Sequence, residues 1–156
     1  MALGKLKVKG IDFMLDVVSD GDFEQYLKKI ETLDLEANVI FHGKKNTSEV
    51  ASIMRHCDFL LLFSNFENFP CVIPEAWSCG LPVLSTNVGG IAEFMNIENG
   101  ILIEPDDTET LGNELEKMLT AHYTFDSQKI RDFAVDHFSY KVIGSQFIDI
   151  YQQALK

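Results

Sequence analysis

The sequence predicts an α/β fold, a Rossmann-like parallel sheet flanked by helices, with further helices at the C-terminus. Apolar runs of strand length alternate with segments of helical apolar periodicity, which is the pattern of repeated strand–helix units. The run Phe59–Phe63 is apolar throughout, as expected of a strand covered by helices on both faces. With 156 residues, of which 46% are apolar, the chain fits one globular domain spanning residues 1–156.

Two strand–helix units are predicted before this apolar run. Ile11–Val18 reads as a strand ending in the turn Asp20-Gly21-Asp22, and Val39–Phe41 reads as a second strand closed by His42-Gly43. The helix between them is expected to bury Phe23, Tyr26, Leu27, Ile30 and Leu33. The next helix is expected to have Asn46, Thr47 or Ser48 as its N-cap and to bury Val50, Ile53 and Met54.

After the apolar run, a helix is predicted to begin between Pro70 and Pro74 and to stop at Gly80 and Pro82. Leu81–Thr86 reads as another buried strand. The loop Val88–Ile91 then opens a short helix near Glu93. Trp77 and Phe94 are interpreted as packing residues.

The last predicted strand, Gly100–Ile103, is followed by three helices. Asp106 and Glu109 have the spacing of a capping box at the start of the first helix. Its inner face is expected to consist of Leu111, Leu115, Met118 and Leu119. The other two helices are centred on Ile130, Phe133 and Ala134, and on Ile143, Phe147, Ile150, Tyr151 and Ala154.

The composition argues against several classes of function. Thirteen Lys and Arg against 24 Asp and Glu give a net charge of −11, which disfavours binding to nucleic acid or to an anionic membrane. The three cysteines show no C-x-x-C spacing, so neither a disulfide framework nor a zinc site is indicated. No signal peptide and no apolar stretch of membrane-spanning length are seen, so we expect a cytoplasmic protein.

A pair of glutamates is the most informative feature. Glu67 follows the buried strand, and Glu75 lies eight positions later at the expected helix start. Ligands of open parallel sheets bind at the carboxyl ends of the strands, and a helix start offers free N–H groups to an anion. One carboxylate could hold the hydroxyls of a ribose and the other those of a sugar ring, with a diphosphate between them. The competing interpretation is two exposed acids without a ligand.

Two other motifs have a functional and an ordinary interpretation. Gly89-Gly90 is either a flexible turn or a ligand loop, and its place after a buried strand favours the ligand loop. Asp20-Gly21-Asp22 has the form of a D-x-D metal motif, but Asp and Gly are common in such turns for local reasons. The four histidines show no ligand spacing, and no metal site is predicted.

Taken together, these residues resemble one family, the retaining glycosyltransferases with the two-domain GT-B fold (family 4-like, glycosyl transferases group 1). The family's E-x7-E signature aligns with Glu67–Glu75. The similarity extends through Val39–Gly43, Cys79–Val83 and Gly89-Gly90, and more weakly over residues 11–155. The resemblance therefore covers nearly the whole chain and implies the C-terminal, donor-binding half of such an enzyme.

The resemblance also implies roles for individual residues. Glu75 would hold the ribose hydroxyls, and Glu67 would be the catalytic residue facing the donor sugar. Backbone near Phe69, Pro70 and Cys71 would lie at the diphosphate, although Pro70 has no N–H. The base would lie near Gly43 and Lys44, and the Gly89-Gly90 loop would adjoin the phosphates.

For the whole enzyme, the resemblance implies a hexosyltransferase that uses a UDP- or GDP-sugar as donor and needs no cofactor. Its partner would be an N-terminal Rossmann domain that carries most of the acceptor site. The acceptor could be membrane-associated, with the enzyme peripheral at the inner membrane. The alternatives are a non-catalytic Rossmann-like nucleotide-binding or regulatory domain, and a GT-B sugar-nucleotide epimerase.

The family's Arg and Lys that clamp the diphosphate have no evident counterpart. The family's Lys-Gly pair lies farther upstream, whereas Lys9-Gly10 ends only ten positions before Asp20. We therefore interpret Lys9-Gly10 as a coincidence just before the first strand. The chain is expected to be a truncated domain that begins one strand–helix unit late and is inactive by itself.

Overall fold

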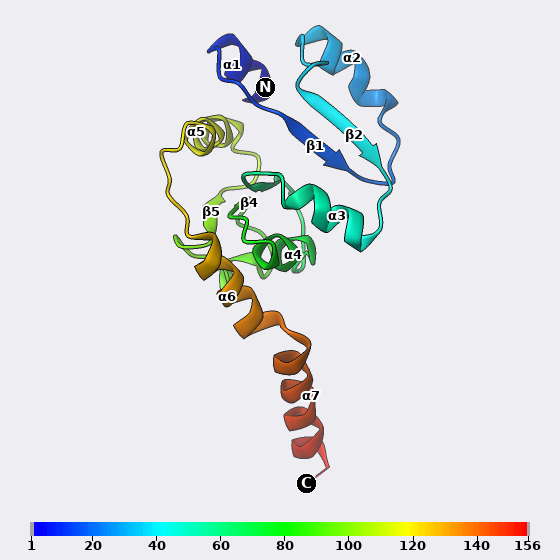
Figure 1. The fold of residues 1–156 in the computed structure, drawn as a ribbon, viewed down its shortest axis with the longest axis vertical. Coiled ribbons are helices and arrows are strands. Elements are labelled where there is room, and N and C mark those ends of the chain that lie inside the picture. The colour runs from blue at the N-terminus through cyan, green and yellow to red at the C-terminus, as the bar shows by residue number, and fades with distance from the viewer. Residues whose placement is uncertain (1, 156) are drawn as a thin grey trace.

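The computed structural model describes residues 2–155 and shows parallel strands connected by helices (Figure 1). The strands are β1 (Leu15–Val18), β2 (Val39–Gly43), β3 (Leu60–Leu62), β4 (Val83–Thr86) and β5 (Gly100–Ile103). The helices are α1 (Ala2–Val8), α2 (Glu24–Thr32), α3 (Thr47–Met54), α4 (Val72–Ser78), α5 (Thr108–Leu119), α6 (Ser127–Phe138) and α7 (Tyr140–Ala154). A 3₁₀ turn, η1, spans Ile91–Glu93.

The strands form two parallel sheets. β1 pairs with β2, and a second sheet has the order β3-β4-β5. The predicted α/β class with a parallel sheet flanked by helices is thus confirmed. Within residues 2–155, β1 and β3 are not paired with each other, so each leaves one edge open.

The three-stranded sheet separates two hydrophobic cores. Leu60 and Leu62 face the core that contains residues of α3, α4 and α6, whereas Leu61 faces the core that contains residues of α1 and α5. Because side chains alternate along a strand, a run that is apolar throughout fills both cores at once. The two-sided packing predicted for Phe59–Phe63 is confirmed, but these side chains are only partly buried.

The N-terminal region differs from the prediction. The predicted strand Ile11–Val18 is wrong at its start, because β1 begins only at Leu15 and a helix, α1, precedes it. Gly10 has a φ of 71°, and hydrogen bonds from Gly10 N to Lys7 O (2.9 Å) and from Ile11 N to Leu6 O (3.1 Å) close α1 as a Schellman motif. Lys9-Gly10 is therefore the C-terminal cap of a helix, a role that the sequence analysis missed.

Helix α2 does not bury the predicted stripe. Tyr26 and Leu27 are each 50% exposed, whereas Ile30 and Leu33 pack partly against the core. Figure 1 shows α2 beside β2, one strand of the two-stranded sheet. A helix at this position has a partner along only part of its apolar face, so a periodic pattern overestimates its burial.

The predicted helix ends are mostly confirmed. Asn46 caps α3 in a capping box with Glu49, and Gly80, with a φ of 81°, ends α4. The predicted cap of α5 is wrong by one residue. Asp107 accepts the hydrogen bond from Thr110 N at 2.9 Å, whereas Asp106 adopts a φ of 61°.

The two C-terminal helices are confirmed, and α7 extends away from the rest of the molecule (Figure 1). Phe147, Ile150 and Tyr151 on α7 are more than half exposed. Within residues 2–155, no helix combines the length and apolar character needed to cross a membrane.

Acid should weaken a partly buried network that joins the end of α5 to Tyr123. Glu114 accepts hydrogen bonds from Lys117 Nζ (2.7 Å) and Tyr123 Oη (2.6 Å). Burial raises the pKa of Glu114, but these bonds outweigh burial and hold it below the ordinary value. A depressed folded-state pKa contributes stability above the unfolded-state pKa, about 4.3, and this stability is lost as the pH falls through the folded-state value.

We therefore expect Glu114→Gln to reduce the acid-induced fall in melting temperature below about pH 4.3. Thermal unfolding of both proteins at a series of pH values measures this difference. Parallel curves for the two proteins would show that Glu114 does not contribute to the acid sensitivity.

Candidate functional site

Helix α4 places Glu75 in its first turn. It begins at Val72, within the predicted Pro70–Pro74 interval, and Ile73 N donates to Pro70 O at 3.1 Å. The amides of Cys71 and Val72 form no hydrogen bond with any residue in 2–155. The carboxylate of Glu75 is exposed and likewise has no hydrogen-bond partner in this part of the chain. The helix start thus presents two free N–H groups and a free carboxylate.

The loop that carries Gly89 and Gly90 lies directly against the Glu67 segment. Gly89 has a φ of 57°, and a Cβ added to it would lie 2.1 Å from Glu67 O and 2.4 Å from Asn68 O. Gly90 N donates to Asn68 O at 2.7 Å. Two segments that are distant in the sequence are thereby held together, and only glycine permits this approach at position 89.

A hydroxyl group ties together the strands from which these loops emerge. Thr86, the last residue of β4, is buried, and its Oγ1 donates to Ser64 O at 2.5 Å and accepts from Ser64 N at 3.2 Å. Both loops therefore start from fixed points at the carboxyl ends of adjacent strands. Sequence reasoning missed Thr86 and Asn68, because neither residue type by itself signals such a contact.

The side chains of Phe69 and Trp77 hold the segment Glu67–Glu75 against the hydrophobic core. The Phe69 ring lies 5.2 Å from that of Phe94 and 5.6 Å from that of Phe138, so its side chain points into the core. Only the backbone of Phe69 is left to face a ligand. Trp77 is fully buried and donates from Nε1 to Asn99 O at 3.0 Å. The packing roles predicted for Trp77 and Phe94 are confirmed.

Gly43 and Lys44 lie at the end of β2, in the other sheet. Gly43 has a φ of 68° with open space around it, and Lys44 is exposed. No hydrogen bond joins these two residues to Glu67–Glu75 within the described chain. The structure thus brings the Glu67 segment into contact with Gly89 and Gly90, whereas Gly43 and Lys44 lie at the end of a strand of the other sheet.

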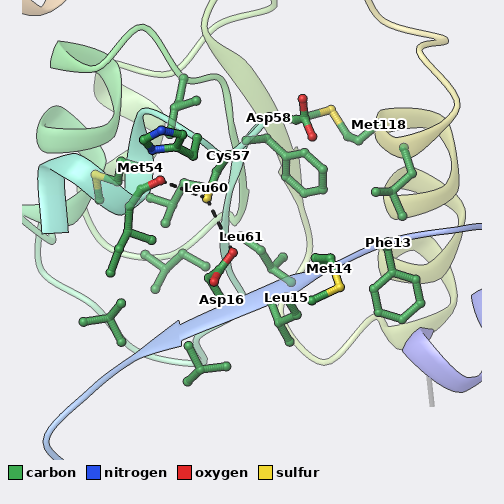
Figure 2. Close-up of a pocket in the computed structure, with 18 of the residues that line it drawn as sticks. Phe13, Met14, Leu15, Asp16, Met54, Cys57, Asp58, Leu60, Leu61 and Met118 are labelled. Atoms are coloured by element: carbon green, nitrogen blue, oxygen red, sulfur yellow. Dashed lines mark hydrogen bonds between the residues drawn. The ribbon is translucent and has the colours of Figure 1, made fainter. Parts of the chain in front are cut away.

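A cavity of about 1030 Å³ lies between the two sheets (Figure 2). Glu75 is among its lining residues. Asp16 projects into this region, where it contacts His42 Nε2 at 2.6 Å and Cys57 Sγ at 4.0 Å. Burial, followed by the charges of Asp16 and Asp58, raises the pKa of Cys57. The thiol therefore stays protonated, which makes it a poor nucleophile.

The turn Asp20-Gly21-Asp22 has a local structural role. Asp22 Oδ1 accepts from Glu24 N at 2.8 Å, and Gly21 N donates to Ser19 Oγ at 3.1 Å. In the part of the chain that the structure describes, no group of three or more His, Cys, Asp or Glu side chains could hold a metal ion.

Residues 1–131 match the family of glycosyl transferases group 1. The chain belongs to this family. It is 31% identical over 153 residues to the N-acetyl-alpha-D-glucosaminyl L-malate synthase of Bacillus anthracis, covering 96% of this chain and 40% of that enzyme.

Solved structures confirm the fold as that of GT-B glycosyltransferases. Sucrose-phosphate synthase of Thermosynechococcus elongatus superimposes with a TM-score of 0.83 at 22% identity, over 99% of this chain and 41% of that one. Anabaena HepE in complex with UDP superimposes with a TM-score of 0.79 at 25% identity, over 90% of this chain and 41% of that one. The chain spans about two fifths of the length of these relatives.

Proposed function

We propose that this family member is the donor-binding domain of a retaining glycosyltransferase that transfers a hexose from a nucleotide sugar. The observation that carries the proposal is the contact of the Gly89 loop with the backbone of Glu67 and Asn68, beside the free amides at the start of α4. Along the chain, Glu67 precedes these N–H groups and Glu75 follows them, so the segment offers a carboxylate before and after them. A sugar, a diphosphate and a ribose require these groups in that order.

In this proposal Glu75 accepts hydrogen bonds from the ribose hydroxyls, and Glu67 faces the donor sugar, as in an E-x7-E signature. The amides of Cys71 and Val72 stabilise the departing diphosphate, which carries the charge that develops during transfer. The Gly89-Gly90 loop keeps the Glu67 backbone in place, and Gly43 and Lys44 border the base. The domain works together with a second Rossmann domain that holds the acceptor.

UDP is the first nucleotide to test. HepE, which is 26% identical to this chain, has been solved with UDP-glucose, with a TM-score of 0.71. The residues around Gly43 and Lys44 do not identify the base, so GDP and ADP belong in the same experiment. Donor binding by this domain is the part of the proposal that can be tested without knowing the acceptor.

Replacing Glu75 by alanine should weaken UDP binding by about tenfold or more, because a hydrogen bond to a charged group contributes about 1.5–3 kcal/mol. The fold should be unaffected, since the carboxylate is exposed and has no partner among residues 2–155. Isothermal calorimetry with UDP and UDP-glucose measures the effect. Glu67→Gln should weaken binding of UDP-glucose but not of UDP.

Glu98→Ala is the matched control, because it removes one exposed carboxylate without touching the site. It should bind UDP as the unmodified chain does. Equal affinity of the Glu75→Ala and Glu98→Ala proteins would contradict the ribose role of Glu75. If UDP, GDP and ADP all fail to bind at millimolar concentration, the donor-site proposal itself is wrong.

A further inference from the structure

Phe66 is an exposed aromatic residue next to Glu67. It is 80% exposed, and among residues 2–155 the only other phenylalanine that is more than half exposed is Phe147 on α7. Phe66 belongs to neither hydrophobic core, and no aromatic ring of the described chain packs against it. The Phe66 ring therefore contributes little to the packing of the domain.

The loop that carries Phe66 is held on both sides by hydrogen bonds to other loops. Before Phe66, Asn65 Nδ2 donates to Asp106 Oδ1 at 2.9 Å. After it, Asn68 O accepts from Gly90 N at 2.7 Å. A side chain presented by a fixed backbone needs little further ordering when it binds a partner, so less of the binding free energy is lost.

The position of this loop in the fold points to a ligand. The loop follows β3, and the residues to which it is bonded, Gly90 and Asp106, follow β4 and β5. Ligands of open parallel sheets bind at this edge, where the carboxyl ends of the strands meet. Single exposed apolar residues are common on protein surfaces. Ile97, which is 83% exposed, is such a residue, because it precedes β5 and lies toward the opposite edge.

An aromatic ring and a carboxylate at adjacent positions suit a pyranose ring. A pyranose carries hydroxyl groups around its rim and C–H groups on its faces. A carboxylate accepts hydrogen bonds from the hydroxyl groups. The C–H groups carry a small positive charge and lie favourably against the negative face of an aromatic ring. Phe66 and Glu67 thus offer a partner for each of the two kinds of surface of a sugar.

We propose that Phe66 binds the sugar of the donor by stacking its ring on one face of the pyranose, while Glu67 accepts hydrogen bonds from the hydroxyl groups. This inference rests on the proposed function, in which Glu67 faces the donor sugar. Phe66 then contributes to the affinity for the sugar and not to the affinity for the nucleotide. The donor class is a nucleotide sugar whose sugar is a pyranose.

Calorimetry of the Phe66→Ala protein with UDP, UDP-glucose and UDP-N-acetylglucosamine tests this role. The substitution should weaken binding of the sugar nucleotide that the unmodified chain binds more tightly by about three- to tenfold. Binding of UDP should not change. Phe66→Tyr keeps the ring and should retain the affinity, whereas Phe66→Leu removes the flat face and should lose it.

Ile97→Ala is the matched control, because it truncates an equally exposed apolar side chain at the other end of the strands. It should bind all three compounds as the unmodified chain does. The melting temperature of Phe66→Ala should also be unchanged, since an exposed ring adds little to stability.

The outcomes separate this inference from the proposed function. If UDP binds but Phe66→Ala changes the affinities for UDP and for the sugar nucleotides equally, or changes none of them, the role of Phe66 is wrong and the donor site stands. Full affinity of Phe66→Leu would likewise overturn stacking. Self-association of the unmodified chain in sedimentation that Phe66→Ala removes would assign the ring to a protein contact and overturn the inference. If no nucleotide binds, the proposed function is wrong and the role of Phe66 falls with it.

Discussion

Replacing Gly89 by alanine is expected to lower the free energy of unfolding by about 3 kcal/mol or more and to abolish donor binding. A Cβ at this position would lie 2.1 Å from Glu67 O and 2.4 Å from Asn68 O, and these backbone atoms cannot rotate away as a side chain would. The positive φ of 57° adds about 1–2 kcal/mol for any L-residue with a Cβ. The Gly89 loop must therefore separate from the Glu67 segment or distort it.

Gly43→Ala is the matched control, because Gly43 has a φ of 68° but no atom within 4 Å of the added Cβ. It should lose only the conformational contribution of about 1–2 kcal/mol. Urea unfolding of the two variants measures the difference in stability, and calorimetry of the Gly89→Ala protein with UDP measures its loss of binding. Equal destabilisation by the two substitutions would show that the Gly89 loop can move away from the added Cβ with no further loss of stability. The loop would then not hold the Glu67 backbone in place.

The central part of the fold could be predicted because its residues have neighbours on all sides. Val83 and Leu84 are fully buried, each in a different core, so the buried strand predicted for Leu81–Thr86 is confirmed by β4. Gly80 ended α4 as predicted, because the positive φ at this position suits glycine alone. Local pattern and tertiary environment agree at these positions.

The elements at the edge of the fold, such as α1 and α2, could not be predicted in the same way. Helix α1 has only Leu6 fully buried, and a short segment with lysines carries little periodic signal. Tyr26 and Leu27 fit a helical stripe, but no layer covers that part of α2. The open edges of β1 and β3 depend on which strands are present, and periodicity within one strand says nothing about its neighbour.

In the candidate site, too, some features follow from local sequence and others depend on the packing of distant segments. The positions of Glu67 and Glu75 relative to a strand and a helix start follow from local sequence. The contact of Gly89 with the Glu67 backbone and the bond from Thr86 to Ser64 arise from the packing of adjacent strands. Residues that hold a site together across strands are thus found only once the strand order is known.

Replacing Trp77 by alanine is expected to cost about 3–5 kcal/mol of stability, the range found when large buried aromatic residues are truncated. Trp77 is fully buried, and its ring lies 5.5 Å from that of Phe133 and 5.9 Å from that of Phe138. These contacts fix α4 against α6. Domains of this size are stable by about 5–15 kcal/mol, so the variant should be largely unfolded at 37 °C or lose much of its stability.

Trp77→Phe separates packing from the hydrogen bond. It keeps most of the apolar ring but loses the donor to Asn99 O, which still accepts from Val83 N at 3.1 Å. Because that carbonyl stays paired, the loss should be only about 1–2 kcal/mol. Since Trp77 is the single tryptophan of the chain, far-UV circular dichroism in urea is the appropriate measurement. If both variants lose a similar amount of stability, the contribution of Trp77 lies in its hydrogen bond. Glu75 lies two residues earlier on α4, so that bond and not the aromatic core would then fix its position.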